Sequence, residues 1–383
     1  MRKYLLFLIS SFLLLNACST GKKSLQHGDY SDAILKAVGR LSNDPDNRKA
    51  AEVVKEGYPM ALTFYQEEID QTLSGNDPFK WKRTLEIMQT VNQISDGVRR
   101  VPAARQLVST IKTYTSEMTD VQNRAAQEYY DAGMDALSRK TREDAKQAFF
   151  HFQNADGLVL GFKDTKQKML TTKELATLKV VVEQIPVNGK YEYLAQFFYD
   201  NVFQMLNQKF QEKDFVHFFS QEEAERAKLK YPDMVLRMGF YDFFIDRPQH
   251  SEEEKELNKQ IEEKYQVKIS KDSTVTRVRM IPKMGKIKIL TDQVASGGLL
   301  ELKTIEFQSQ KIVFTDKIPG QFTWQNKYGI FVGDNEVLDK ELSNILNNKM
   351  IMPPAAQDMF VLFTKPIFNQ LTEKLTNYFK QYN

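Results

Sequence analysis

Residues 178–189, LKVVVEQIPVNG, mark the place where the sequence changes from a helical pattern to a strand pattern. Three consecutive β-branched residues, Val180 to Val182, are closed by Pro186 and by Asn188-Gly189, which predicts a buried strand. Upstream of this run, apolar residues recur at helical spacing. We therefore expect two domains, a helical one over residues 18–175 and an α/β one over residues 176–383.

Downstream of this run, helix-like and strand-like segments alternate and then give way to a series of strands before a last helix. Ser220 and Glu223 form a capping-box pair at the start of one helix. Two turns are predicted between the later strands, at Gln310-Lys311 and at Pro319-Gly320. The order of elements predicts an α+β protein whose second domain has a mixed, largely antiparallel sheet.

One charged stretch interrupts the series of strands. Residues 251–266, SEEEKELNKQIEEKYQ, are rich in strong helix formers, and Ser251 with Glu254 resembles a helix start. We therefore expect a charged helical insertion near residues 249–266.

The second domain resembles a domain of bacterial envelope proteins. Residues 299–320, LLELKTIEFQSQKIVFTDKIPG, are similar to the hairpin of the curli-secretion lipoproteins, of the lipoprotein activators of penicillin-binding proteins, and of the N-terminal domain of the Tol-system β-propeller protein. The sequence QSQKIVF stands where those families have a Thr-Gly turn, and the charged insertion is a second departure. The resemblance implies an envelope accessory domain, and it carries over no catalytic residues.

The first domain contains two stretches that resemble tetratricopeptide repeats. In residues 27–47, Gly28 stands at the turn between helices, and Ala33 and Ala37 are the small residues where helices approach. In residues 129–155, Gly133 and Ala145 occupy matching positions. Stacked repeats form a concave face that usually binds a segment of another protein. A plain helical spacer is the alternative.

Three aromatic residues of this domain are the candidates for partner binding: Tyr65, Trp81 and Tyr129. Aromatic side chains supply much of the binding energy at protein interfaces. Packing between helices is the competing interpretation, and for Tyr129, at a repeat core position, it is the stronger one.

The N-terminus has the pattern of a lipoprotein signal. Arg2 and Lys3 precede an apolar run that is too short to span a bilayer as a mature helix. The following residues 15–18, LNAC, resemble the bacterial lipoprotein box, which implies that residues 1–17 are removed and that Cys18 is lipidated. Ser19 follows Cys18, with no Asp to retain the protein in the inner membrane. We therefore expect an anchor in the inner leaflet of the outer membrane and a body that faces the periplasm.

Several kinds of site are not expected. Without residues 1–17 the chain is nearly neutral, and the clustered positive charge that nucleic-acid binding needs is missing. The four histidines lack metal-like spacing, and no phosphate-binding glycine loop is present. No cofactor, metal, small-molecule substrate or catalytic residue is therefore predicted. Asp242 and Asp246 could act as an acid–base pair, but a structural role is the preferred interpretation.

These observations predict a protein without enzymatic activity, a scaffold or accessory subunit of an envelope assembly or secretion complex. The alternative is a lipoprotein that activates a peptidoglycan synthase. An activator would need a long tether to reach the cell wall, whereas predicted helix begins near Ser24, close to the lipidated residue. This short distance favours the scaffold.

Overall fold

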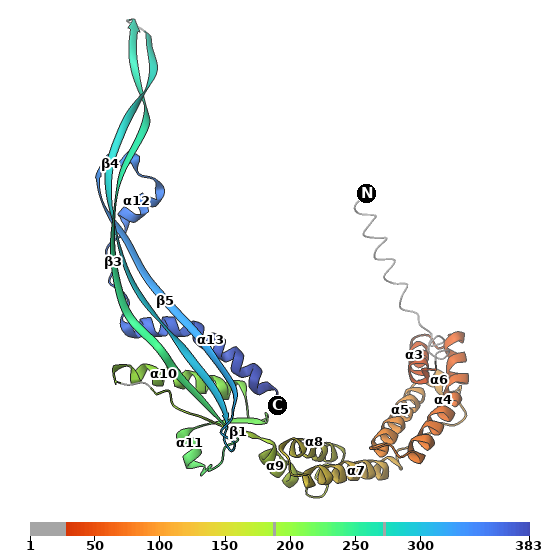
Figure 1. Ribbon diagram of the computed structural model, residues 1–383. Coiled ribbons are helices and arrows are strands. Elements are labelled where there is room, and N and C mark those ends of the chain that lie inside the picture. Colours follow the sequence, from red (N-terminus) through yellow and green to blue (C-terminus); the bar gives the residue numbers. More distant parts are fainter. Residues whose placement is uncertain (1–27, 187–188, 271–272) are drawn as a thin grey trace. The chain divides into compact units, whose positions relative to one another are not determined.

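The computed structural model describes residues 28–186, 189–270 and 273–383. The chain divides into two compact units, of which the first ends at Ala176 and the second begins at Thr177 (Figure 1). Cys18 lies outside the described residues, as do the side chains of Asp242 and Asp246. Among the residues described, no helix is both long and apolar enough to cross a lipid bilayer.

The first unit is helical, and helices that follow one another along the chain pack together. The helices are α3 (Tyr30–Asn43), α4 (Arg48–Ser74), α5 (Lys80–Arg100), α6 (Pro102–Arg105), α7 (Met118–Ser138), α8 (Arg142–Leu158) and α9 (Thr165–Ala176). Asp29, Asn47 and Thr141 cap α3, α4 and α8, each by accepting a hydrogen bond from a backbone N–H of the first turn. The boundaries of these helices are therefore set by local sequence.

Small residues allow the helices to approach closely. Ala33 and Ala37 are fully buried in the core around α3 and α4. Gly133 of α7 lies against the ring of Phe152 of α8, which is itself fully buried. The core of this unit thus depends on alanine and glycine where two helix backbones come near each other.

The second unit is an α+β unit built on one five-stranded sheet with the order β2-β1-β3-β4-β5. Its strands are β1 (Leu178–Val182), β2 (Val216–Ser220), β3 (Met234–Ser270), β4 (Ser273–Glu306) and β5 (Ile312–Gly333). β1 pairs in parallel with β2 and β3, whereas β3–β4 and β4–β5 are antiparallel. The predicted fold class, helices followed by a mixed and largely antiparallel sheet, is confirmed.

Two long helices pack on this sheet and form the main core with it. These are α10 (Glu192–Lys209) and α13 (Ala356–Lys380), whose buried side chains join those of β1 to β5 in one hydrophobic cluster. The remaining helical elements are η1 (Gly189–Tyr191), α11 (Gln221–Arg226), η2 (Asn335–Val337) and α12 (Lys340–Asn347). The capping box predicted for Ser220 and Glu223 is present at the start of α11.

The predicted helical insertion at residues 249–266 is wrong, because this segment is part of strand β3. Opposite it lies the basic part of β4, so its glutamates form cross-strand ion pairs. Glu252 contacts Lys288 at 2.6 Å, Glu254 contacts Lys286 at 2.8 Å, and Glu263 contacts Arg279 at 2.5 Å. These partners are distant in sequence, and cross-strand pairs of opposite charge stabilise a strand that local helix propensity disfavours.

The second predicted turn, at Pro319-Gly320, is also wrong, whereas the chain does turn between β4 and β5 over residues 307–311, which include the predicted Gln310-Lys311. Pro319 and Gly320 lie inside β5, which is at the edge of the sheet, where a missing N–H is tolerated. A Cβ atom at Gly320 would lie 2.4 Å from the carbonyl oxygen of Phe363 in α13. The glycine therefore allows α13 to cross the strand closely and does not form a turn.

Candidate protein-binding groove

The helical unit has an apolar groove between α3 and α4. It is an open surface depression with a volume of about 410 Å³, and it is lined by Tyr30, Pro59, Met60, Thr63, Phe64 and Glu67. Met60 is 50% exposed and Phe64 is 41% exposed, although both are large apolar side chains. Glu67 is the one charged residue of the lining. The groove has the composition of a site that binds an apolar side chain of a partner and has an acidic rim.

The groove forms because α4 has two apolar faces, of which only one packs in the core. One face of α4 is buried in the cores of the unit and includes Val54, Tyr58 and Ala61. Met60 and Phe64 are spaced four residues apart, so they lie one turn from each other on a second, uncovered face. The ring of Phe64 contacts that of Tyr30 from α3, with ring centroids 5.0 Å apart. The contact with Tyr30 therefore holds the ring of Phe64 in place, and the second apolar face stays exposed because it does not pack in the core.

Tyr65, the first of the three predicted partner-binding residues, lies beside this groove. Its ring contacts that of Phe64 edge-on, with centroids 5.3 Å apart. The side chain is half-buried against the cores of the helical unit, and burial raises the pKa of its phenol. Tyr65 thus supports the groove residue Phe64 and does not line the groove itself.

Trp81 and Tyr129 lie near each other at the contact between α5 and α7. The backbone N–H of Trp81 donates a hydrogen bond to the Glu128 carboxylate at 3.1 Å, and the guanidinium of Arg124 stacks over the indole at 4.7 Å. Burial raises the pKa of Glu128. Tyr129 stacks on Phe79, with ring centroids 4.4 Å apart. Both aromatic residues thus contact neighbouring helices, and their role in binding a partner stays a prediction.

Sequence reasoning missed the residues that line the groove: Tyr30, Met60 and Phe64. The sequence does contain a pattern that indicates Met60 and Phe64. Both are apolar residues of α4 that lie outside the buried stripe of Val54, Tyr58 and Ala61. A helix that is apolar on more than one face has more apolar surface than a single packing contact needs.

The other candidate residues lie on the sheet unit. Asp242 and Asp246 both belong to β3, but two register shifts, between Tyr241 and Phe244 and between Phe244 and Arg247, interrupt the strand alternation on which their pairing was predicted. Within the described part of the chain, no group of three or more His, Cys, Asp or Glu residues could hold a metal ion.

One histidine has carboxylate neighbours. The Nδ1 atom of His250 lies 2.6 Å from a carboxylate oxygen of Asp292 on β4, and its Nε2 atom lies 3.4 Å from Glu252. These hydrogen bonds, first to Asp292 and then to Glu252, raise the pKa of His250. Because the Glu252 carboxylate also contacts Lys288, this cluster links β3 to β4 through side chains.

Comparisons with known proteins give little further information. No protein-family model matches the chain, and no curated protein matches it by sequence. A solved structure described as a neuraminyllactose-binding hemagglutinin homolog from Helicobacter pylori is similar, with 15% identity over 54% of this chain and 90% of that chain. The TM-score is 0.25, at which the likeness carries no argument about function.

Proposed function

We propose that this protein is a non-enzymatic scaffold or accessory subunit of an envelope assembly or secretion complex, lipid-anchored through Cys18 with its body facing the periplasm. The observation that carries the proposal is the uncovered apolar groove of Tyr30, Met60 and Phe64. Large apolar side chains that are exposed together on a protein surface are typical of protein-interaction sites.

Two further observations support the envelope part of the proposal. The residues LNAC at 15–18 resemble a lipoprotein box, and residues 299–320 resemble the hairpin of envelope accessory lipoproteins such as those of curli secretion. The helical unit resembles tetratricopeptide repeats at residues 27–47 and 129–155, and such repeats bind segments of other proteins. The partner expected is therefore another envelope protein, which contributes an apolar segment to the groove.

Site-specific photo-crosslinking in the native cells tests this proposal. A photoreactive amino acid is placed at Met60, and the control is the same amino acid at Leu170 of α9, which is 68% exposed and does not line the groove. The expected result is one discrete cross-linked envelope protein from position 60 that is absent from position 170. Adding Phe64→Glu should abolish this product with only a small fall in the melting temperature, because Phe64 is 41% exposed and loses only its ring contacts with Tyr30 and Tyr65.

The same products from both positions, or no product from position 60, would contradict the groove as a binding site. A product that persists unchanged in the Phe64→Glu variant would show that the partner contacts α4 without using the groove.

A further inference from the structure

The far end of the β3–β4 hairpin is a ribbon of only two strands. β5 pairs with β4 as far as the Gly333–Gly285 pair, and beyond it the described residues pair only β3 with β4. We call residues 258–270 and 273–284 the distal ribbon; Figure 1 shows it extending past α12. An isolated two-stranded ribbon is only marginally stable in water, so a surface that covers it would stabilise it.

The distal ribbon exposes apolar side chains on both faces. Val278, Met280 and Met284 alternate along β4 on one face, where they are 53%, 57% and 63% exposed. Tyr265 of β3 and Val275 of β4 lie on the opposite face of the ribbon, and they are exposed as well. A folded partner protein would pack against one face of such a ribbon. A fluid surface such as the headgroup region of a lipid bilayer can surround apolar side chains on both faces.

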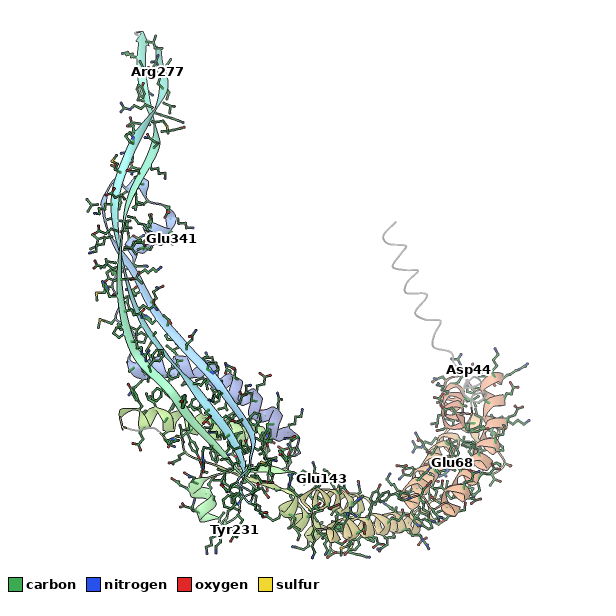
Figure 2. All side chains as sticks on the ribbon, in the orientation of Figure 1. Asp44, Glu68, Glu143, Tyr231, Arg277 and Glu341 are labelled. Atoms are coloured by element: carbon green, nitrogen blue, oxygen red, sulfur yellow. The ribbon has the colours of Figure 1, made fainter. Side chains whose placement is uncertain are left out.

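The distal ribbon also has an excess of positive charge. Its basic side chains are Lys259, Lys264, Lys268, Arg277, Arg279 and Lys283, against the acidic side chains Glu262 and Glu263. Glu263 is bound to Arg279, and Lys283 lies 3.5 Å from Asp334 and from Glu336. Exposed basic residues remain on both strands, and Figure 2 labels one of them, Arg277, near the end of the ribbon. The surface that complements this charge is anionic.

We propose that the distal ribbon docks on the surface of an anionic phospholipid bilayer, with its apolar side chains at the depth of the headgroups. Lysine and arginine can place their aliphatic stems along apolar surface while the charged ends reach lipid phosphates. The ribbon does not enter the hydrocarbon core, because its open strand edges would leave backbone groups without partners there.

Two features disfavour a second copy of the chain as the occupant. Two distal ribbons carry charge of the same sign and repel each other. Pro282 also lacks an N–H, so the edge of β4 cannot offer a continuous ladder of hydrogen bonds to an added strand.

A fluorophore on the ribbon tests the proposal in the full chain. Cys18→Ala removes the one native cysteine, and Val278→Cys then provides a single thiol for an environment-sensitive nitrobenzoxadiazole dye. With vesicles that contain phosphatidylglycerol, we expect blue-shifted emission and at least a roughly twofold rise in intensity, and with vesicles of phosphatidylcholine alone we expect no change. The dye at Glu256→Cys, an exposed position of β3 nearer the body of the unit, should stay in water with both. The dye senses only the surroundings of residue 278, so binding of the chain to vesicles through its N-terminus would not by itself shift the emission.

A charge variant checks the electrostatic part. Lys264→Glu with Lys268→Glu reverses two charges whose cross-strand neighbours are Val278 and Thr274, which are not carboxylates. Affinity for the anionic vesicles should fall by roughly fivefold or more for each lysine replaced. The proposal is overturned if the dye at position 278 stays in water, if it responds equally to both kinds of vesicle, or if its emission shifts with protein concentration in the absence of lipid. The last outcome would identify a second copy as the occupant.

Discussion

Replacing Gly133 by alanine tests whether the close approach of α7 and α8 is as tight as the structure shows. A Cβ atom at Gly133 would lie 2.8 Å, 2.9 Å and 3.0 Å from three ring carbons of Phe152. Carbon atoms in contact prefer separations of about 3.5–4.0 Å. Phe152 is fully buried and its ring also contacts that of Tyr130, so it cannot move away freely.

Two opposing contributions decide the sign of the effect. Alanine is preferred over glycine inside a helix by about 1 kcal/mol, whereas overpacking a core costs about 1–3 kcal/mol. We expect Gly133→Ala to lower the free energy of unfolding of the helical unit by about 0–2 kcal/mol, the excess of the second contribution over the first. Gly157→Ala in α8 is the matched control, because nothing lies within 4 Å of a Cβ atom there. This control should stabilise the unit by about 0.4–1 kcal/mol.

Urea denaturation followed by tryptophan fluorescence measures both effects. The chain has two tryptophans, Trp81 in the helical unit and Trp324 in the sheet unit. A Trp324→Phe background therefore leaves Trp81 as a reporter of the helical unit alone. If Gly133→Ala is as stabilising as Gly157→Ala, the packing argument is wrong. Phe152→Leu should reduce the cost of Gly133→Ala, because the smaller side chain vacates part of the space that the new methyl group needs.

Three further predictions concern the N-terminus, the sheet and the division of the chain. Cys18→Ala should abolish incorporation of a labelled fatty acid and leave an uncleaved or soluble form; a processed outer-membrane form of this variant would place the anchor elsewhere. His250 should titrate above its ordinary pKa of 6.5. Its ion pairs should therefore stabilise the β3–β4 hairpin fully below about pH 6.5 and lose this contribution as the pH rises through the raised pKa. Nuclear magnetic resonance titration of labelled histidines should show the pKa fall in Asp292→Asn, and equal values in both proteins would contradict the contact. A chain that begins at Thr177 should melt cooperatively, because β1 to β5, α10 and α13 share one core; aggregation or a featureless far-ultraviolet spectrum would indicate that both units fold together.

Features set by neighbouring residues could be predicted from the sequence alone. The run at 178–182, with its three consecutive valines, forms strand β1, and Leu194, Phe198 and Val202, which are spaced four residues apart in the sequence, lie on the buried face of α10. The capping box at Ser220 and the turn at Gln310-Lys311 likewise depend on residues a few positions apart. Such features follow from backbone sterics, local hydrogen bonds and hydrophobic periodicity, all of which can be read within a short window.

Only the tertiary structure decided the features whose partners are distant in sequence. Residues 249–266 have the composition of a helix, yet β4 pairs with this segment along its whole length and supplies basic partners such as Lys286 and Lys288, and the segment is a strand. Gly320 has the local signature of a turn, yet it gives α13 room to cross β5. The groove of Tyr30, Met60 and Phe64 exists because one face of α4 is left uncovered when the other packs. In each case the deciding energy comes from contacts between residues brought together by folding, and local propensity is too weak to oppose them.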